Sequence, residues 1–288
     1  MRVVLLGATA ESTGTVSDFI ARAGFEDSAP PIETLTVVAS TLTDATVHGL
    51  RFSPDIDALT MPATEPVAGG AVDELLAYRV DAEWFPMTER TLAAAVLRTR
   101  LLNLGYTLAQ ATAAMAKRFS PDFDILPLSN QAVEAFAIVD STAWPIHRWL
   151  AEGRPAAEEF ALSGLDAAQA APGVLAAIRA ADLVLVCTEA MPEFGVEAVV
   201  SLPGMKDALE GTRGHVVALA GDRLGDGDRR DEGDHLGDDD HHDHASRHGD
   251  HRDRLRQHLG SVTFVDSVAE AVALGEIDRR TSTIWDHA

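Results

Sequence analysis

Three aspartates lie within one short stretch of the chain, TLTDATVHGLRFSPDIDAL, residues 41–59. Asp44, Asp55 and Asp57 follow a β-branched run, TLTVVAS, that is typical of a buried strand. Acidic oxygens just past a strand end could hold Mg²⁺ together with water and substrate phosphates. If the backbone is extended, Asp55 and Asp57 project to the same face as a carboxylate pair. The alternative is a turn in which Asp55, after Pro54, caps the backbone, and spacing alone leaves both interpretations open.

A second candidate site follows the first apolar run, at GATAEST. Backbone N–H groups beside Gly7 could approach a cofactor phosphate, but such a loop needs several glycines, and only Gly7 and Gly14 are present. A plain strand-to-helix turn is the competing interpretation. Cys187 lies in an apolar strand pattern, and His48 and His147 have no obvious partners, so we expect structural roles for all three.

The segment 221–256 has a different composition from the rest of the chain. It holds 12 Asp or Glu, 7 Arg and 6 His with almost no apolar residues, which predicts a disordered insertion. Metal storage or sensing through its histidines is the alternative, although a structured zinc site usually has cysteines at fixed spacing.

The candidate residues must be positioned by alternating strands and helices. Apolar runs predict strands at 2–7, 34–39, 124–128, 135–139, 183–187, 215–221 and 261–265. Helical spacing predicts helices at 89–105, at 108–119 with Thr107 as N-cap, and at 172–182. This alternation predicts a three-layer α/β fold, a mostly parallel Rossmann-like sheet with helices on both faces, within a single domain over 1–288. Ligands of such sheets bind at the carboxyl ends of the strands, where the three aspartates lie.

The amino-acid composition argues against several classes of binding partner. With 23 basic and 45 acidic residues the net charge is −22, which argues against binding to nucleic acids or anionic membranes. No apolar run reaches the length of a membrane span. One cysteine fits a reducing cytoplasm.

The order of several motifs resembles the 2-phospho-L-lactate transferase (CofD-like) family, whose members assemble the deazaflavin coenzyme F420. STLTDATVHGLRFSPDIDAL matches the family's acidic motif after its second strand. EWFPMTERTLAAAVLRTRLLNLGYTLAQAT and DILPLSNQAVEAF match the next two motifs, followed by PGVLAAIRAADLVLV and SLPGMKDAL. The match covers roughly residues 34–209, and its specificity comes from the order and spacing of the pieces.

The resemblance implies a Mg²⁺-dependent transferase. A phospholactyl or phosphoenolpyruvyl group would move from a guanosine diphosphate donor to a hydroxyl of the deazaflavin precursor FO, and GMP would leave. Such a reaction depends mostly on positioning and charge neutralisation. Members of this family are often homodimers.

The resemblance also assigns residues by position. Asp55 and Asp57 would be catalytic and bind the metal, and Asp44, Asp57, Arg90, Arg98 and Asn130 would bind substrates. Arg98 lies two helical turns after Arg90, which places both near one helix face.

This chain departs from the family pattern at several positions. Thr43 stands where the family has the first of two paired aspartates, and GATAEST replaces a glycine-rich first loop. These differences keep a second hypothesis open, a catalytically degenerate member that binds nucleotide or deazaflavin in a regulatory role.

Overall fold

The computed structural model describes residues 1–23, 31–64, 67–78, 84–187, 194–219, 252–259 and 261–275. The predicted insertion at 221–256 lies almost entirely outside these ranges, so its disorder and its metal binding stay predictions. None of the helices in the described ranges combines the length and apolar character that crossing a bilayer requires.

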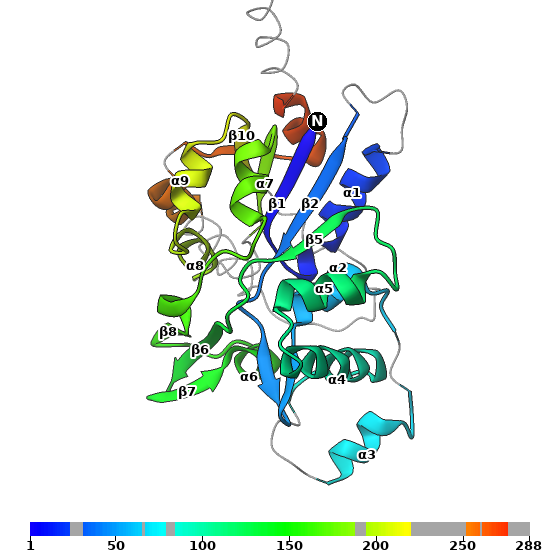
Figure 1. Ribbon diagram of the computed structural model, residues 1–288. Coiled ribbons are helices and arrows are strands. Elements are labelled where there is room, and N and C mark those ends of the chain that lie inside the picture. Colours follow the sequence, from blue (N-terminus) through cyan, green and yellow to red (C-terminus); the bar gives the residue numbers. More distant parts are fainter. Residues whose placement is uncertain are drawn as a thin grey trace, which may run out of the picture.

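The main sheet has six parallel strands in the order β11-β10-β9-β1-β2-β5 (Figure 1). The strands are β1 Arg2–Ala8, β2 Thr34–Ala39, β5 Asp124–Pro127, β9 Leu183–Val186, β10 His215–Leu219 and β11 Thr263–Val265. Read from β5 toward β11, this is the doubly wound order 3-2-1-4-5-6, in which the winding direction reverses beside β1. The predicted parallel sheet is confirmed.

Helices cover both faces of this sheet. Alternate residues of β1 show why: Val3 and Leu5 pack into one buried cluster with Phe19 of α1, while Val4 and Leu6 pack into another. The first cluster includes α1 Thr13–Ala23, α2 Pro54–Thr60 and α5 Leu108–Ala116. The second includes α6 Ile146–Ala151, α7 Val174–Ala180, α8 Gly195–Val200 and α9 Met205–Glu210. The three predicted layers are therefore present.

Capping residues explain where the two long predicted helices begin. In α4, Glu89–Asn103, the Thr88 side chain accepts from the Thr91 N–H. In α5, the Thr107 side chain accepts from the Gln110 N–H, as the sequence predicts. α5 ends at Ala116, three residues before the predicted end.

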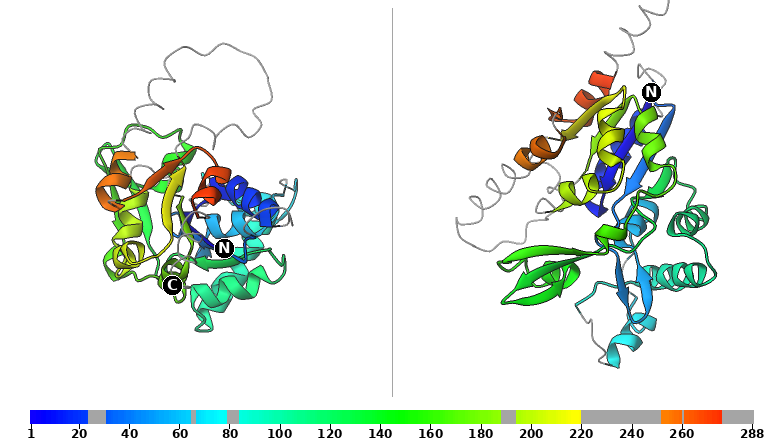
Figure 2. Two further views of the ribbon diagram at one scale, coloured as in Figure 1. Left: turned by 90° about the horizontal axis from the view of Figure 1, so that it is seen from above. Right: turned by 60° about the vertical axis from the view of Figure 1, so that its left-hand side comes forward.

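A second, antiparallel sheet lies toward the carboxyl ends of the parallel strands (Figure 2). It has the order β7-β6-β8, built from β6 Glu134–Val139, β7 Thr142–Pro145 and β8 Glu159–Ser163. The strand predicted at 135–139 is therefore real, but it belongs to this sheet and not to the parallel one. Ala135, Ala137 and Val139 bury their side chains in the same cluster as Val4 and Leu6.

The remaining elements are short. They are the hairpin β3 Ala45–Val47 and β4 Leu50–Phe52, α3 Ala71–Ala77, and the 3-10 turns η1 Ala10–Ser12 and η2 Leu165–Ala167. Residues 252–259 and 268–275 are also helical.

Candidate functional site

The three aspartates of residues 41–59 lie on different backbone elements. Asp44 ends the turn after β2, whereas Asp55 and Asp57 lie in the first turn of α2. Asp55 and Asp57 therefore do not lie in extended backbone, which was the condition for the two carboxylates to project to the same face. Residues two apart on a helix do not share a face, and each of these two carboxylates has its own partners. A helix forms here because Pro54 fits the first helical position and acidic residues favour the first turn.

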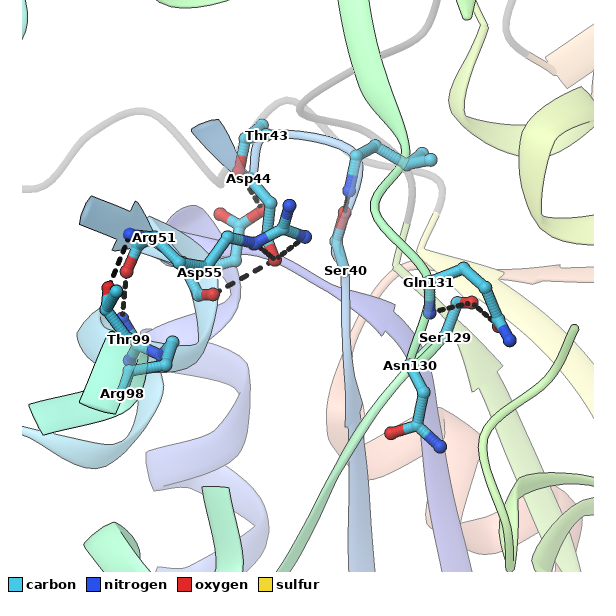
Figure 3. Close-up of polar contacts among 12 residues, drawn as sticks. Ser40, Thr43, Asp44, Arg51, Asp55, Arg98, Thr99, Ser129, Asn130 and Gln131 are labelled. Carbon is cyan, nitrogen blue, oxygen red and sulfur yellow. Dashed lines mark hydrogen bonds and ion pairs between the residues drawn. The ribbon is translucent and has the colours of Figure 1, made fainter. Parts of the chain in front are cut away.

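Asp44 is buried at the centre of a polar cluster with one oxygen unused (Figure 3). Its Oδ2 accepts from Arg51 Nη2 at 2.6 Å, from Arg51 Nε at 3.1 Å and from Ser53 Oγ at 3.0 Å. Its Oδ1 is buried and has no hydrogen-bond partner. An unpaired carboxylate oxygen in a buried place is costly, so it marks a position where a cation or a donor group would be stabilised.

Asp55 links the first loop of the chain to the loop after β2. Its Oδ1 accepts from the Ala10 N–H at 3.0 Å, and its Oδ2 accepts from Thr43 Oγ1 at 2.6 Å. Burial raises the pKa of Asp55 from 3.8 to about 7, against the lowering effect of these two hydrogen bonds; the nearby charges of Glu11 and Asp44 raise it further. Asp55 therefore changes its charge near neutral pH.

Asp57 is committed to a buried ion pair. Both of its oxygens accept from Arg98, whose Nη1 also donates to the Arg51 carbonyl at 3.3 Å. Burial raises the pKa of Asp57 to about 6, and the charge of Arg98 limits that rise. Burial likewise raises the pKa of Asp44, opposed by the charges of Arg51 and Arg98. The three carboxylates and two arginines form one buried charge network, which we call the acidic cluster.

The other predicted site residues lie at different distances from this cluster. Arg98 belongs to it, and Arg90 lies eight residues earlier on α4, about 12 Å along the helix. Arg90 donates to the Pro62 carbonyl at 2.6 Å, and both arginines line one cavity of about 540 Å³. The expectation that they lie near the same helix face is confirmed.

Asn130 and Gly7 belong to the ends of other strands of the sheet, and Gly7 lies within β1, one residue before that strand ends. Asn130 comes after β5 and lies apart from Asp44 and Asp55 (Figure 3), and its Oδ1 accepts from the Ala109 N–H at the start of α5. Gly7 has a φ of 75° and coincides with a shift in register between β1 and β2. After Gly7 the Thr9 N–H donates to Ser12 Oγ and the Ala10 N–H to Asp55, so two N–H groups of this loop are already bound by side chains.

Two contributors have no strong signal in the sequence. Thr43 completes the partners of Asp55, and the ring of His147 hydrogen-bonds the Thr43 carbonyl through Nε2. Burial lowers the pKa of His147, so the neutral ring donates its N–H to that carbonyl. His147 is 104 residues from Thr43 in the sequence, so only the fold reveals the contact.

The structure permits a test of whether these residues could hold Mg²⁺. Asp44 offers a buried oxygen without a partner, and Asp55 is held by two neutral donors, whereas both oxygens of Asp57 face a guanidinium. Hard oxygen donors of this kind suit Mg²⁺, which commonly uses one or two carboxylates with waters and phosphates. No group of three or more His, Cys, Asp or Glu converges among the described residues. The residues therefore fit a two-carboxylate site.

Comparisons with known proteins show which family the chain belongs to. Residues 14–269 match the family model described as 2-phospho-L-lactate transferase CofD. A Mycobacterium ulcerans (strain Agy99) protein named phosphoenolpyruvate transferase is 33% identical over 205 residues, which cover 65% of this chain and 62% of that protein. A Mycolicibacterium smegmatis protein of the same name is 32% identical over 224 residues, covering 71% and 68%. The chain thus spans about three fifths to two thirds of the length of these two relatives.

Solved structures show the same fold at lower identity. Two crystal structures of a Bacillus halodurans protein, one described as a member of the UPF0052 family, align with TM-scores of 0.50 and 0.55 at 16% and 15% identity. The second alignment covers 95% of this chain and 85% of that one. With the sheet order, the acidic cluster and a family match over most of its length, this chain belongs to the 2-phospho-L-lactate transferase CofD family.

Proposed function

We propose that this protein transfers a phosphoenolpyruvyl or phospholactyl group from a guanosine diphosphate donor to the deazaflavin precursor FO, in coenzyme F420 biosynthesis. The observation that carries the proposal is the acidic cluster at the carboxyl end of β2, one strand from the point where the sheet reverses its winding. Relatives named phosphoenolpyruvate transferase at about 30% identity favour the enolpyruvyl donor over the lactyl one.

In this reaction the FO hydroxyl oxygen forms a bond to the phosphorus of the transferred phosphoenolpyruvyl or phospholactyl group, and the hydroxyl proton is released to water. The bond from that phosphorus to the bridging oxygen of the diphosphate breaks, and GMP leaves with the bridging oxygen. Such transfers need positioned groups and neutralised charge more than covalent help from the protein.

We assign Mg²⁺ to Asp44 Oδ1 and Asp55, the two carboxylates that fit it in this structure. When bound, the ion would neutralise charge on the diphosphate. The resemblance implies that Asp57 also binds the metal, but Arg98 donates hydrogen bonds to both oxygens of Asp57. We therefore give Asp57 the role of holding Arg98 and α2 in place.

Other residues orient the site. Thr43 holds Asp55 through a 2.6 Å hydrogen bond, and Arg51 and Ser53 fix the orientation of Asp44. The cluster thereby stays preorganised before substrate arrives. Arg90, Asn130 and Gly7 stay predicted contacts to substrate or nucleotide phosphates, and a homodimer and a cytoplasmic location also stay predictions.

A transfer assay tests the proposal. The full chain is incubated with FO, Mg²⁺ and the guanosine diphosphate donor carrying enolpyruvate or lactate, and product and GMP are followed by mass spectrometry. We expect equal amounts of product and GMP, with the enolpyruvyl donor preferred. Folded protein that forms no product above a no-enzyme control would contradict the proposal and favour a member of the family that only binds its ligands.

A further inference from the structure

An exposed carboxylate lies on the first loop of the chain, beside the acidic cluster. Glu11 is part of η1 and its side chain is exposed, whereas Asp44 and Asp55 are 2% and 4% exposed. The residue before it, Ala10, donates its N–H to Asp55 Oδ1 at 3.0 Å, which holds this part of the loop against Asp55. The charge of Glu11 raises the pKa of Asp55 more than the charge of Asp44 does. Of these three carboxylates, Glu11 is therefore the one that an ion in solvent reaches directly.

The side chain of Glu11 is held in one orientation, and one of its oxygens is free. Thr9 Oγ1 donates to Glu11 Oε2 at 2.9 Å, and the Thr9 N–H donates to Ser12 Oγ at 3.1 Å. Thr9 is 4% exposed, so it forms a fixed support for the carboxylate. Glu11 Oε1 makes no hydrogen bond or ion pair with the described part of the chain. A carboxylate that is already oriented loses little side-chain entropy when it binds a ligand.

The charges around Glu11 favour a cation. Asp55 is held by neutral donors, and Arg51 is the counter-charge of Asp44, so no basic residue of the described ranges neutralises Glu11. Mg²⁺ gives up its waters reluctantly and usually keeps several of them when it is bound to a protein. Among the described residues no three carboxylates converge on one ion. Glu11 is therefore suited to contact the hydration shell of an ion, and not to join both aspartates as a direct ligand.

We propose that Glu11 is a further binding residue for the divalent cation of this site. Its Oε1 accepts a hydrogen bond from a water of the hydration shell, while Asp44 and Asp55 contact the ion itself. The inference rests on the Mg²⁺ assignment made under the proposed function. It gives the first loop a role that its N–H groups do not supply, because those of Thr9 and Ala10 are already bound by side chains.

Ion binding to the wild type and to Glu11→Gln tests this inference without any transfer reaction. Mg²⁺ and hexaamminecobalt(III) are titrated separately; the ammonia ligands of the cobalt ion do not exchange, so it binds only through hydrogen bonds from its shell. NMR shifts of the backbone amides of residues 9–12 report binding at this loop and not at other acidic surfaces. We expect the dissociation constants of both ions to rise about 2- to 5-fold in Glu11→Gln, as for the loss of one exposed charge contact.

Glu74→Gln makes the same chemical change at an exposed glutamate on α3 and serves as the matched control. It should leave both dissociation constants unchanged. The proposal is overturned if Glu74→Gln weakens binding as much as Glu11→Gln, because the effect is then one of net charge. It is also overturned if Glu11→Gln binds hexaamminecobalt(III) like the wild type.

The same titration separates this inference from the proposed function. If the amides of residues 9–12 in the wild type shift with neither ion, the cation site itself is absent and the inference fails with it. A wild-type protein that binds both ions, with the expected loss in Glu11→Gln, but forms no product in the transfer assay contradicts the proposed function and supports the role of Glu11.

Discussion

Asp55 has no cationic partner in its own hydrogen bonds, although it is as deeply buried as Asp57. Its partners are a hydroxyl and a backbone N–H, which cannot offset the loss of hydration of a charge. This difference is why Asp55 holds a proton up to about pH 7 in the folded state.

The pH dependence of stability follows from that difference. The pKa of Asp55 is about 7 when folded against an ordinary 3.8, so between these values the folded protein retains a proton that the unfolded chain releases. Asp55 therefore makes its full contribution to the unfolding free energy below about pH 4. That contribution is lost as the pH rises to 7, which lowers the unfolding free energy by about 4 kcal/mol. Asp55→Asn removes the charge, while its Oδ1 can still accept from the Ala10 N–H and its Nδ2 can donate to the Thr43 hydroxyl. Urea unfolding without Mg²⁺ should show a smaller fall of the unfolding free energy from pH 4 to 7 in Asp55→Asn; an unchanged fall would contradict the assignment.

Asp57 and Arg98 should behave as a unit. Asp57→Asn leaves the guanidinium of Arg98 buried without its counter-charge and should lower the unfolding free energy by about 3–5 kcal/mol. The double variant Asp57→Leu with Arg98→Met removes both charges and should recover much of that loss. Chemical denaturation measures both. If the single and the double variant lose the same amount of unfolding free energy, the loss in Asp57→Asn does not come from leaving Arg98 without its counter-charge.

At the scale of elements, the site depends on a contact between α6 and the loop after β2. The neutral His147 ring hydrogen-bonds the Thr43 carbonyl, and its edge packs against Phe85 with ring centres 4.9 Å apart. This contact fixes the loop that carries Thr43 and Asp44 against the second half of the molecule.

Substitutions of His147 distinguish the contribution of its hydrogen bond to stability from the contribution of its ring packing. His147→Phe keeps a ring against Phe85 but removes the donor, and should cost about 1–3 kcal/mol in the unfolding free energy because a buried carbonyl loses its partner. His147→Gln restores a donor and should recover part of the loss, as measured by urea denaturation. If His147→Phe is as stable as the wild type, the hydrogen bond does not hold the loop.

Some elements could be predicted from the sequence because their signals are local. The buried run 34–39 became β2 with the predicted bounds, and Thr107 caps α5 through its own third neighbour. The helix α2 was not predicted, although Ser53, Pro54 and the acidic residues after them match a helix start as well as the turn considered above. The sequence could not decide between those two, and the structure does.

The partners within the site could not be predicted for a physical reason. Arg98 meets Asp57 across 41 residues and His147 meets Thr43 across 104, and no local pattern encodes such pairs. The antiparallel sheet β6–β8 was missed for a similar reason, because strand 135–139 resembles any other buried strand in sequence. The three aspartates were correctly placed at the carboxyl end of a strand, but their separate partners depend on tertiary contacts.

At the scale of the whole molecule, the parallel sheet brings the ends of β1, β2 and β5 to one edge. Gly7 lies within β1, one residue before that strand ends, and Asp44 and Asn130 follow β2 and β5. α2 and α4 then add Asp55 and Arg98 to the Asp44 side of that edge. The family relation and the acidic cluster together support a single central claim, that this edge of the sheet transfers a phosphorus-containing group.

The most direct test is the turnover of Asp55→Asn in the transfer assay with FO, Mg²⁺ and the enolpyruvyl guanosine diphosphate donor. Asp122→Asn, which changes an exposed aspartate, serves as the matched control. With folding verified by circular dichroism, we predict that Asp55→Asn loses at least about 100-fold in turnover and that Asp122→Asn keeps wild-type turnover. Wild-type turnover by a folded Asp55→Asn protein would contradict the claim that the acidic cluster carries the reaction.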